Sequence, residues 1–83
     1  MYKAKINVTL KKSVLDPQGK TVLHALETLG FKEARDLRVG KFFELTLGIT
    51  DKSEAERKVR EMCDKLLTNP VIEEYSYELE QVK

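Results

Sequence analysis

The chain has few of the residues on which most catalytic and metal sites depend. Its 83 residues include one cysteine, one histidine and no tryptophan. A single cysteine excludes an internal disulfide bond, and one cysteine with one histidine excludes an ordinary four-ligand zinc site within the chain. An excess of one charge is also lacking, since 15 Lys and Arg residues balance 14 Asp and Glu residues. This balance argues against a nucleic-acid or anionic-membrane binding module, which usually carries a clear basic excess.

Long apolar runs are absent as well. No uninterrupted run exceeds three residues, whereas a membrane-spanning helix needs ~20. The chain does not open with a basic stretch followed by an apolar one, and we therefore expect a cytoplasmic location. Apolar residues still make up 41% of the chain and charged residues 35%, which is typical of a folded domain. The length allows one small domain, residues 1–83, without separate cofactor and substrate domains.

The first segments predict a strand followed by a helix. Apolar residues alternate with polar ones over residues 2–11, which indicates a strand with one buried face. Asp16 is suited to cap the next helix and Pro17 to its first position. Gly19 is a poor helix former in that first turn, so we expect it to have a packing or backbone-approach reason. The apolar stripe of this helix has the spacing i, i+3, i+4, i+7: Val22, Ala25, Leu26 and Leu29.

The next segment, residues 35–50, returns to alternation with its apolar residues at odd positions. Lys41 interrupts this apolar face directly after Gly40. Two interpretations stay open: a hairpin turn at Val39-Gly40, or one long strand that bends at Gly40. Uninterrupted, the strand would have about sixteen residues, against a usual five or six. A strand longer than its own small domain needs a partner, and we therefore expect self-association, as a dimer or a dimer of dimers.

A second helix and a final strand complete the pattern. The helix begins at Asp51 with the spacing of a capping box, and Asn69-Pro70 ends it because the residue before proline avoids the helical region. Residues 71–82 form the last strand. The predicted fold is an α+β two-layer sandwich, order β-α-β(long, bent or split)-α-β, with two helices on one face of an antiparallel sheet. The expected core residues are Ile6, Val8, Leu26, Leu29, Leu45, Leu47, Val59, Met62 and Leu66.

No group of residues points to catalysis by this chain alone. His24 is expected on the solvent face of its helix, without an orienting partner. Cys63 lies beside the core stripe of the second helix, and a packed small side chain is the simpler interpretation. The four glycines fit neither phosphate-binding motif. The stretch 38–43 is similar to the basic-aromatic strand of RNA-recognition sheets, but it lacks the later residues of that motif.

Three stretches together resemble a known family. Residues 14–19 (VLDPQG), 37–41 (LRVGK) and 63–73 (CDKLLTNPVIE) resemble the signature blocks of PurS. PurS proteins are the small subunits of phosphoribosylformylglycinamidine synthase in purine biosynthesis. The resemblance covers essentially the whole chain. Its most specific part is the first block followed about twenty residues later by R-V-G-K.

The resemblance implies a non-catalytic role in a ligase complex that converts formylglycinamide ribonucleotide, glutamine and ATP to formylglycinamidine ribonucleotide. A large synthetase subunit would use ATP and Mg²⁺, and a glutaminase subunit would release ammonia. This chain would bridge the two as a dimer and help to enclose the ammonia path. It would hold no cofactor itself, and neither a nucleic acid nor a membrane is an expected partner. The alternative is a βαββαβ regulatory module that binds a small ligand at a dimer interface.

Two loops contain residue types that local structure does not fully explain, and loops hold functional residues disproportionately. Gln18 is not required to start a helix, and Lys41 breaks an apolar strand face. Arg38 offers a planar set of donors that suits a carboxylate on another chain. The candidate partner interface consists of Asp16, Pro17, Gln18, Gly19, Arg38, Gly40 and Lys41.

Overall fold

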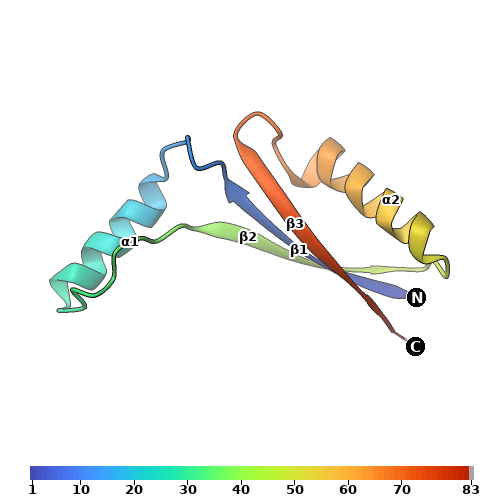
Figure 1. Ribbon diagram of the computed structural model, residues 1–83, viewed down its shortest axis with the longest axis horizontal. Coiled ribbons are helices and arrows are strands. Elements are labelled where there is room, and N and C mark those ends of the chain that lie inside the picture. Colours follow the sequence, from blue (N-terminus) through green and yellow to red (C-terminus); the bar gives the residue numbers. More distant parts are fainter. Residues whose placement is uncertain (83) are drawn as a thin grey trace.

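The computed structural model describes residues 1–82 as three strands and two helices, the second helix ending in a π turn (Figure 1). In chain order the elements are β1 (Tyr2–Leu10), α1 (Pro17–Thr28), β2 (Gly40–Leu47), α2 (Lys52–Met62), the π turn η1 (Cys63–Leu67) and β3 (Glu73–Gln81). The sheet is antiparallel, with β1 between β2 and β3. The predicted α+β class and order of elements are confirmed. Neither helix in this part of the chain is long and apolar enough to cross a membrane.

The central strand β1 supplies the centre of the core. Ala4, Ile6 and Val8 are fully buried, as the alternation along this segment predicted. Ile6 stands between Phe43 of β2 and Tyr77 of β3. Because side chains alternate along every strand, the odd-numbered residues of the outer strands share one face with the even-numbered residues of β1. That face is apolar along most of its length.

The opposite face of the sheet carries charge. Lys3 forms an ion pair with Glu44 across β1 and β2, with 3.2 Å between Nζ and Oε2. Lys5 forms one with Glu80 of β3, with 3.4 Å between the corresponding atoms. All four side chains are at least one-third exposed, so each pair contributes at most about 1 kcal/mol to stability. This face is therefore solvated, while the apolar face holds the fold together.

The helix α2 covers the apolar face through a buried row. Ala55 and Val59 are fully buried, and Cys63 at the start of η1 continues the row. The wider π turn then changes the period, so that Thr68 is buried and Leu66 is 83% exposed. The prediction that Leu66 lies in the core is wrong, because it extended the α-helical spacing into a turn with a different period.

The helix α1 lies beyond the end of the sheet rather than over it (Figure 1). Leu29 is 73% exposed and Leu26 is only partly buried, so the prediction that both lie in the core is wrong for Leu29 and met in part for Leu26. The expectation that helices cover the apolar face holds for α2. The Cα radius of gyration is 16.3 Å, whereas a compact domain of this length has about 12 Å. The molecule is elongated because α1 is held at its end.

The strand predicted over residues 35–50 is shorter in the structure. β2 begins at Gly40, and residues 35–39 form an irregular connection that returns from α1. The structure thus has neither a hairpin turn nor a bend within one strand at this glycine. A Cβ at position 40 would lie 2.5 Å from the carbonyl oxygen of Val8. Gly40 is therefore explained by close approach of β2 to β1.

Candidate partner-binding site

The seven residues predicted for a partner interface lie together at the junction between α1 and the sheet. The start of α1 reaches the start of β2 through a hydrogen bond from the Val39 amide to Asp16 Oδ2, 2.9 Å long. The end of β1 reaches the same place through Arg38. The structure therefore brings together two segments that are about twenty residues apart in the sequence. We call this region the junction.

Asp16 organises the junction from a nearly buried position. Its carboxylate accepts hydrogen bonds from the amides of Gly19, 3.0 Å away, and Val39. The first is the N-terminal cap that the sequence predicted. The second ties the helix to β2, and the sequence pattern contained no signal for it. The two backbone amides, with the nearby Arg38 guanidinium, hold the pKa of the Asp16 carboxyl below its ordinary value.

Gly19 has the packing reason that the sequence predicted. A Cβ at this position would lie 2.5 Å from the carbonyl oxygen of Leu37 and 2.7 Å from Asp16 Oδ2. Real Cβ atoms do not approach other atoms so closely, so a larger residue would push the first turn of α1 away from the returning chain. Gly19 therefore has a structural role within this chain.

Arg38 also has a partner within its own chain. One guanidinium nitrogen, Nη2, donates to the carbonyl oxygens of Leu10 at 2.9 Å and Lys11 at 3.0 Å. Leu10 is the last residue of β1 and Lys11 follows it, so Arg38 donates to backbone carbonyls at the point where the strand ends. The side chain is exposed. Within residues 1–82 its other guanidinium N–H groups have no hydrogen-bond acceptor.

Lys41 forms an ion pair with Glu73 on the apolar face of the sheet. Its Nζ lies 3.3 Å from Oε2 of Glu73, whose side chain is 14% exposed. Glu73 also accepts a hydrogen bond of 2.7 Å from the amide of Asn69. Both groups lower the pKa of the Glu73 carboxyl, and the Asn69 amide has a larger effect than Lys41. Sequence reasoning singled out Lys41 but missed Glu73, although Glu73 likewise interrupts the apolar face of its strand.

A small depression of about 210 Å³ marks the surface of the junction. Its wall includes Asp16, Gln18, Gly40, Lys41 and Glu73. Gln18 and Pro17 also line a neighbouring shallow hollow with Thr21, Val22 and Val39. Gln18 is exposed, and no side-chain hydrogen bond within residues 1–82 explains why a glutamine occupies this position. The junction can therefore offer hydrogen bonds and shape to a partner.

The side chains with reactive chemistry lie elsewhere and do not form a site. His24 is exposed on α1, as predicted. Cys63 is fully buried, and burial raises the pKa of its thiol, which leaves less of the nucleophilic thiolate. Within residues 1–82, no group of three or more His, Cys, Asp and Glu side chains could hold a metal ion.

Comparison with known proteins gives a consistent result over the whole chain. A family model described as PurS, phosphoribosylformylglycinamidine (FGAM) synthase, matches residues 3–81. The phosphoribosylformylglycinamidine synthase subunit PurS of Bacillus subtilis is 52% identical over 82 residues, which cover 99% of this chain and 96% of the relative. The corresponding subunit of Methanocaldococcus jannaschii is 37% identical over the full length of both chains.

Solved structures agree with the sequence matches. The crystal structure of the M. jannaschii PurS has a TM-score of 0.90 to this chain and covers 100% of both chains. A chain in the structure of PurLQS from Thermotoga maritima has a TM-score of 0.88 at 33% identity, over 95% of this chain and 96% of that chain. These matches support the resemblance seen in the sequence over the alternative of a small-ligand regulatory module. This chain belongs to the PurS family of phosphoribosylformylglycinamidine synthase subunits.

Proposed function

We propose that this chain is the small, non-catalytic subunit of a phosphoribosylformylglycinamidine synthase and bridges its glutaminase and synthetase subunits. The observation that carries the proposal is the match along nearly the whole chain to a protein in the PurLQS structure. The chemistry of the chain agrees, because the junction offers a shaped polar surface. The sheet would act as a rigid support for this junction.

In the proposed complex the reacting groups belong to the other subunits. The large subunit binds ATP and Mg²⁺ and amidates formylglycinamide ribonucleotide, and the glutaminase hydrolyses glutamine. This chain holds the two in register so that ammonia passes between them without reaching bulk water. The complex acts in the cytoplasm.

Within the junction, we assign different roles to the seven interface residues. Asp16, Gly19, Arg38, Gly40 and Lys41 all have partners within the chain or close backbone contacts, and they fix the shape of the surface. Pro17 and Gln18 are exposed at the start of α1. These two residues therefore make the direct contacts with another subunit.

Reconstitution of the complex tests the role of the chain. Glutamine-dependent synthase activity is measured in a mixture of the large subunit and the glutaminase, with and without this chain. We expect glutamine-dependent turnover to fall at least tenfold without it, while ammonia-dependent turnover by the large subunit falls less. Equal glutamine-dependent rates in both mixtures would contradict the proposal.

The contact residues are tested by Gln18→Ala, with Gln81→Ala as the matched control. Gln81 is an exposed glutamine at the other end of the sheet, opposite Tyr2 in the register. Gln18→Ala should leave the free chain folded and weaken its assembly with the other subunits, whereas Gln81→Ala should change neither. Normal assembly of the Gln18 variant would place the interface elsewhere on the chain.

A further inference from the structure

A polar hollow lies next to the junction, between the loop that precedes α1 and the segment that returns from this helix. Its volume is about 340 Å³. The wall is formed by residues 12–16, by Lys20 near the start of α1 and by residues 36–38. A hydrogen bond from the Val39 amide to Asp16 Oδ2 ties the returning segment to the loop. The hollow is therefore held in shape by the same contact that joins α1 to the sheet.

Three side chains in this wall are positively charged and lack an anionic partner. Lys12, Lys20 and Arg38 are exposed, and none of them forms an ion pair within residues 1–82. Two aspartates also line the hollow, so three positive charges face two negative ones and the wall has a formal charge of +1. We call this region the cationic hollow.

The two aspartates have their carboxylates occupied by backbone amides. Asp16 is 8% exposed, and both of its carboxylate oxygens accept hydrogen bonds from amides of its own chain. Asp36 Oδ1 accepts from the amide of Leu37, 3.0 Å away. Such donors stabilise the negative charges where they stand, and neither aspartate forms an ion pair in the part of the chain that the structure describes, residues 1–82. The three cations therefore stay available to an anion from outside the chain.

Arg38 gives the hollow a donor that is already oriented. Its Nη2 donates to the carbonyl oxygens of Leu10 and Lys11, and these two bonds hold the guanidinium in place. The remaining guanidinium N–H groups have no acceptor within residues 1–82. A planar guanidinium can donate to two oxygens of one anion at once, and it loses less freedom on binding when it is held beforehand. The hydroxyl of Ser13, also in the wall, is a further donor.

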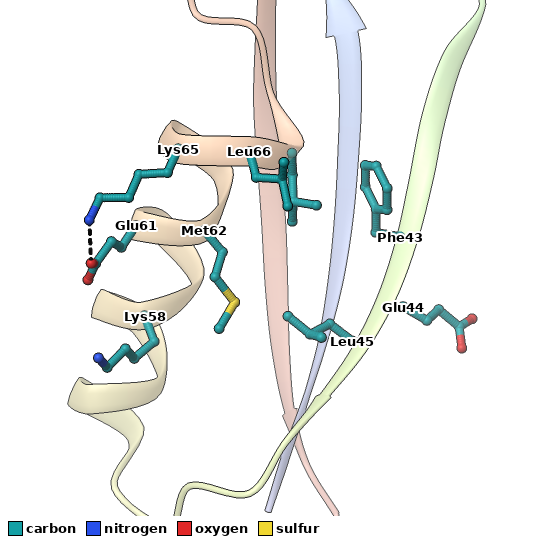
Figure 2. A pocket seen from close by; sticks show the side chains of 9 residues that line it. Phe43, Glu44, Leu45, Lys58, Glu61, Met62, Lys65 and Leu66 are labelled. Atoms are coloured by element: carbon teal, nitrogen blue, oxygen red, sulfur yellow. Dashed lines mark hydrogen bonds and ion pairs between the residues drawn. The ribbon is translucent and has the colours of Figure 1, made fainter.

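The groove between α2 and β2 differs in kind from the cationic hollow (Figure 2). It is larger, at about 490 Å³, and Figure 2 shows apolar side chains such as Met62 and Leu45 facing each other across it. Lys65 beside this groove is paired with Glu61, with 2.9 Å between Nζ and Oε1. The groove therefore suits apolar groups, whereas the cationic hollow offers unpaired positive charge and hydrogen-bond donors.

We propose that the cationic hollow binds a phosphate group, as free phosphate or as the phosphate of a small monoester. A phosphate monoester carries about two negative charges near neutral pH and has three strong acceptor oxygens. Arg38 donates to two of these oxygens, and the ammonium groups of Lys12 and Lys20 balance the remaining charge. The inference concerns the isolated chain and does not rest on its role in the synthase.

The hollow has room for more than the phosphate itself. Roughly 300–1,000 Å³ is typical of small-molecule sites, and the cationic hollow lies near the lower limit of this range. Its wall also contains the apolar side chains of Val14, Leu15 and Leu37, against which a sugar can pack. A sugar phosphate is therefore a monoester that the wall accommodates.

Titrations followed by the amide resonances of the whole chain give the first test. Inorganic phosphate and ribose 5-phosphate, each at millimolar concentration, should shift the resonances of Ser13 and Lys20 in a saturable way and leave that of Ile6 unchanged. Tighter binding of ribose 5-phosphate would identify a monoester as the ligand, and equal affinity would identify free phosphate; both results support the site. No saturable shift with either probe, or equal shifts with ribose, would overturn the proposal.

Malonate separates recognition of phosphate from attraction by charge alone. This dicarboxylate is also a dianion near neutral pH, but its oxygens do not surround one central atom. We expect its dissociation constant to be at least threefold higher than that of inorganic phosphate. Equal affinity would show that the hollow responds to any dianion and would overturn the assignment to phosphate.

Removal of positive charge from the wall tests the position of the site. The double variant Lys12→Ala, Lys20→Ala should raise the dissociation constant for inorganic phosphate at least fivefold at low ionic strength, where exposed charges are least screened. The double variant Lys32→Ala, Lys52→Ala is the matched control, because both lysines are exposed and neither lines the hollow. An equal effect of the control would show that net charge alone attracts the anion, and it would overturn the proposal.

The opposite change in the wall should strengthen binding. Asp36→Asn removes a negative charge and keeps an oxygen that can accept from the Leu37 amide. We expect the dissociation constant for inorganic phosphate to fall at least twofold. Glu33→Gln, at an exposed position outside the wall, removes the same charge and should change little. A gain of equal size in both variants would contradict a local site.

Discussion

The two ends of the molecule are built on different interactions. At one end α2 buries Ala55, Val59 and Cys63 completely against the sheet. At the other end α1 has Gly19 as its only buried residue, and hydrogen bonds of Asp16 hold its first turn. Burial of apolar area stabilises the first region, whereas the second has its position fixed but its apolar surface left open.

This difference separates the part of the chain that buries an apolar core from the part that leaves its apolar side chains exposed. The sheet and α2 bury a common apolar core and form a rigid support. α1 is oriented by the junction yet lacks the burial that stabilises a helix of its length. The exposure of its apolar side chains is therefore a consequence of where the junction holds the helix.

The largest expected effect on stability comes from truncating one leucine at each end of the molecule. Leu47 is 6% exposed in the core, and Leu47→Ala should lower the free energy of unfolding by about 2–5 kcal/mol. Leu29→Ala should have a much smaller effect, because Leu29 is 73% exposed. Thermal denaturation measures both variants. A loss of stability at Leu29 as large as that at Leu47 would remove the distinction between the two ends.

Much of the sheet end could be predicted from the sequence because its signals are local and periodic. The alternation in β1 and the expected core position of Val59 correspond directly to burial. The α1 stripe is an equally clear periodic signal, but Val22 and Leu29 are exposed, because the pattern does not specify where the helix lies relative to the sheet. The prediction for Leu66 was wrong for a different reason. A π turn changes the helical period without a distinctive residue pattern.

The candidate site was predicted as a set of residues but not as a structure. The sequence identified Asp16 as a helix cap and Gly19 as a packed glycine, because both depend on neighbours in the chain. The contacts of Arg38 with Leu10 and Lys11 join residues 27 and 28 positions apart. Such contacts depend on the tertiary fold, so sequence reasoning assigned this guanidinium to another chain instead.

Removal of Arg38 tests whether the junction holds the end of the sheet. Arg38→Ala removes the side-chain donor to the carbonyl oxygens of Leu10 and Lys11, of which only that of Lys11 keeps a second donor in the Val14 amide. We expect a loss of roughly 1 kcal/mol in the free energy of unfolding. Arg35→Ala is the matched control, because Arg35 is exposed and has no hydrogen bond or ion pair within residues 1–82. Urea unfolding of both variants measures the difference. Equal stability of the two would show that Arg38 is free to serve a partner alone.

Acid should loosen the α1 end before the sheet end. The pKa of the Asp16 carboxyl is lowered by its backbone donors, so its stabilising contribution is present above the ordinary carboxyl pKa. This contribution is lost as the pH falls through the lowered value. We expect the amide resonances of Gly19 and Val39 to shift in this range while that of Ile6 stays constant. In Asp16→Asn, which has no carboxylate to protonate, the pH-dependent shift should be absent, and its persistence would assign the transition to another group.

The smallest expected effect concerns the ion pair of Lys41 with Glu73. Lys41 is about half exposed, so the pair contributes little in water, and Lys41→Met also restores the apolar face beside Val8. Thermal denaturation should therefore detect almost no change. Glu73→Gln should be more harmful, because it also weakens the hydrogen bond from the Asn69 amide that orders the chain before β3. If Lys41→Met instead destabilised the chain as much as Arg38→Ala, Lys41 would join Arg38 as a residue that holds the junction together.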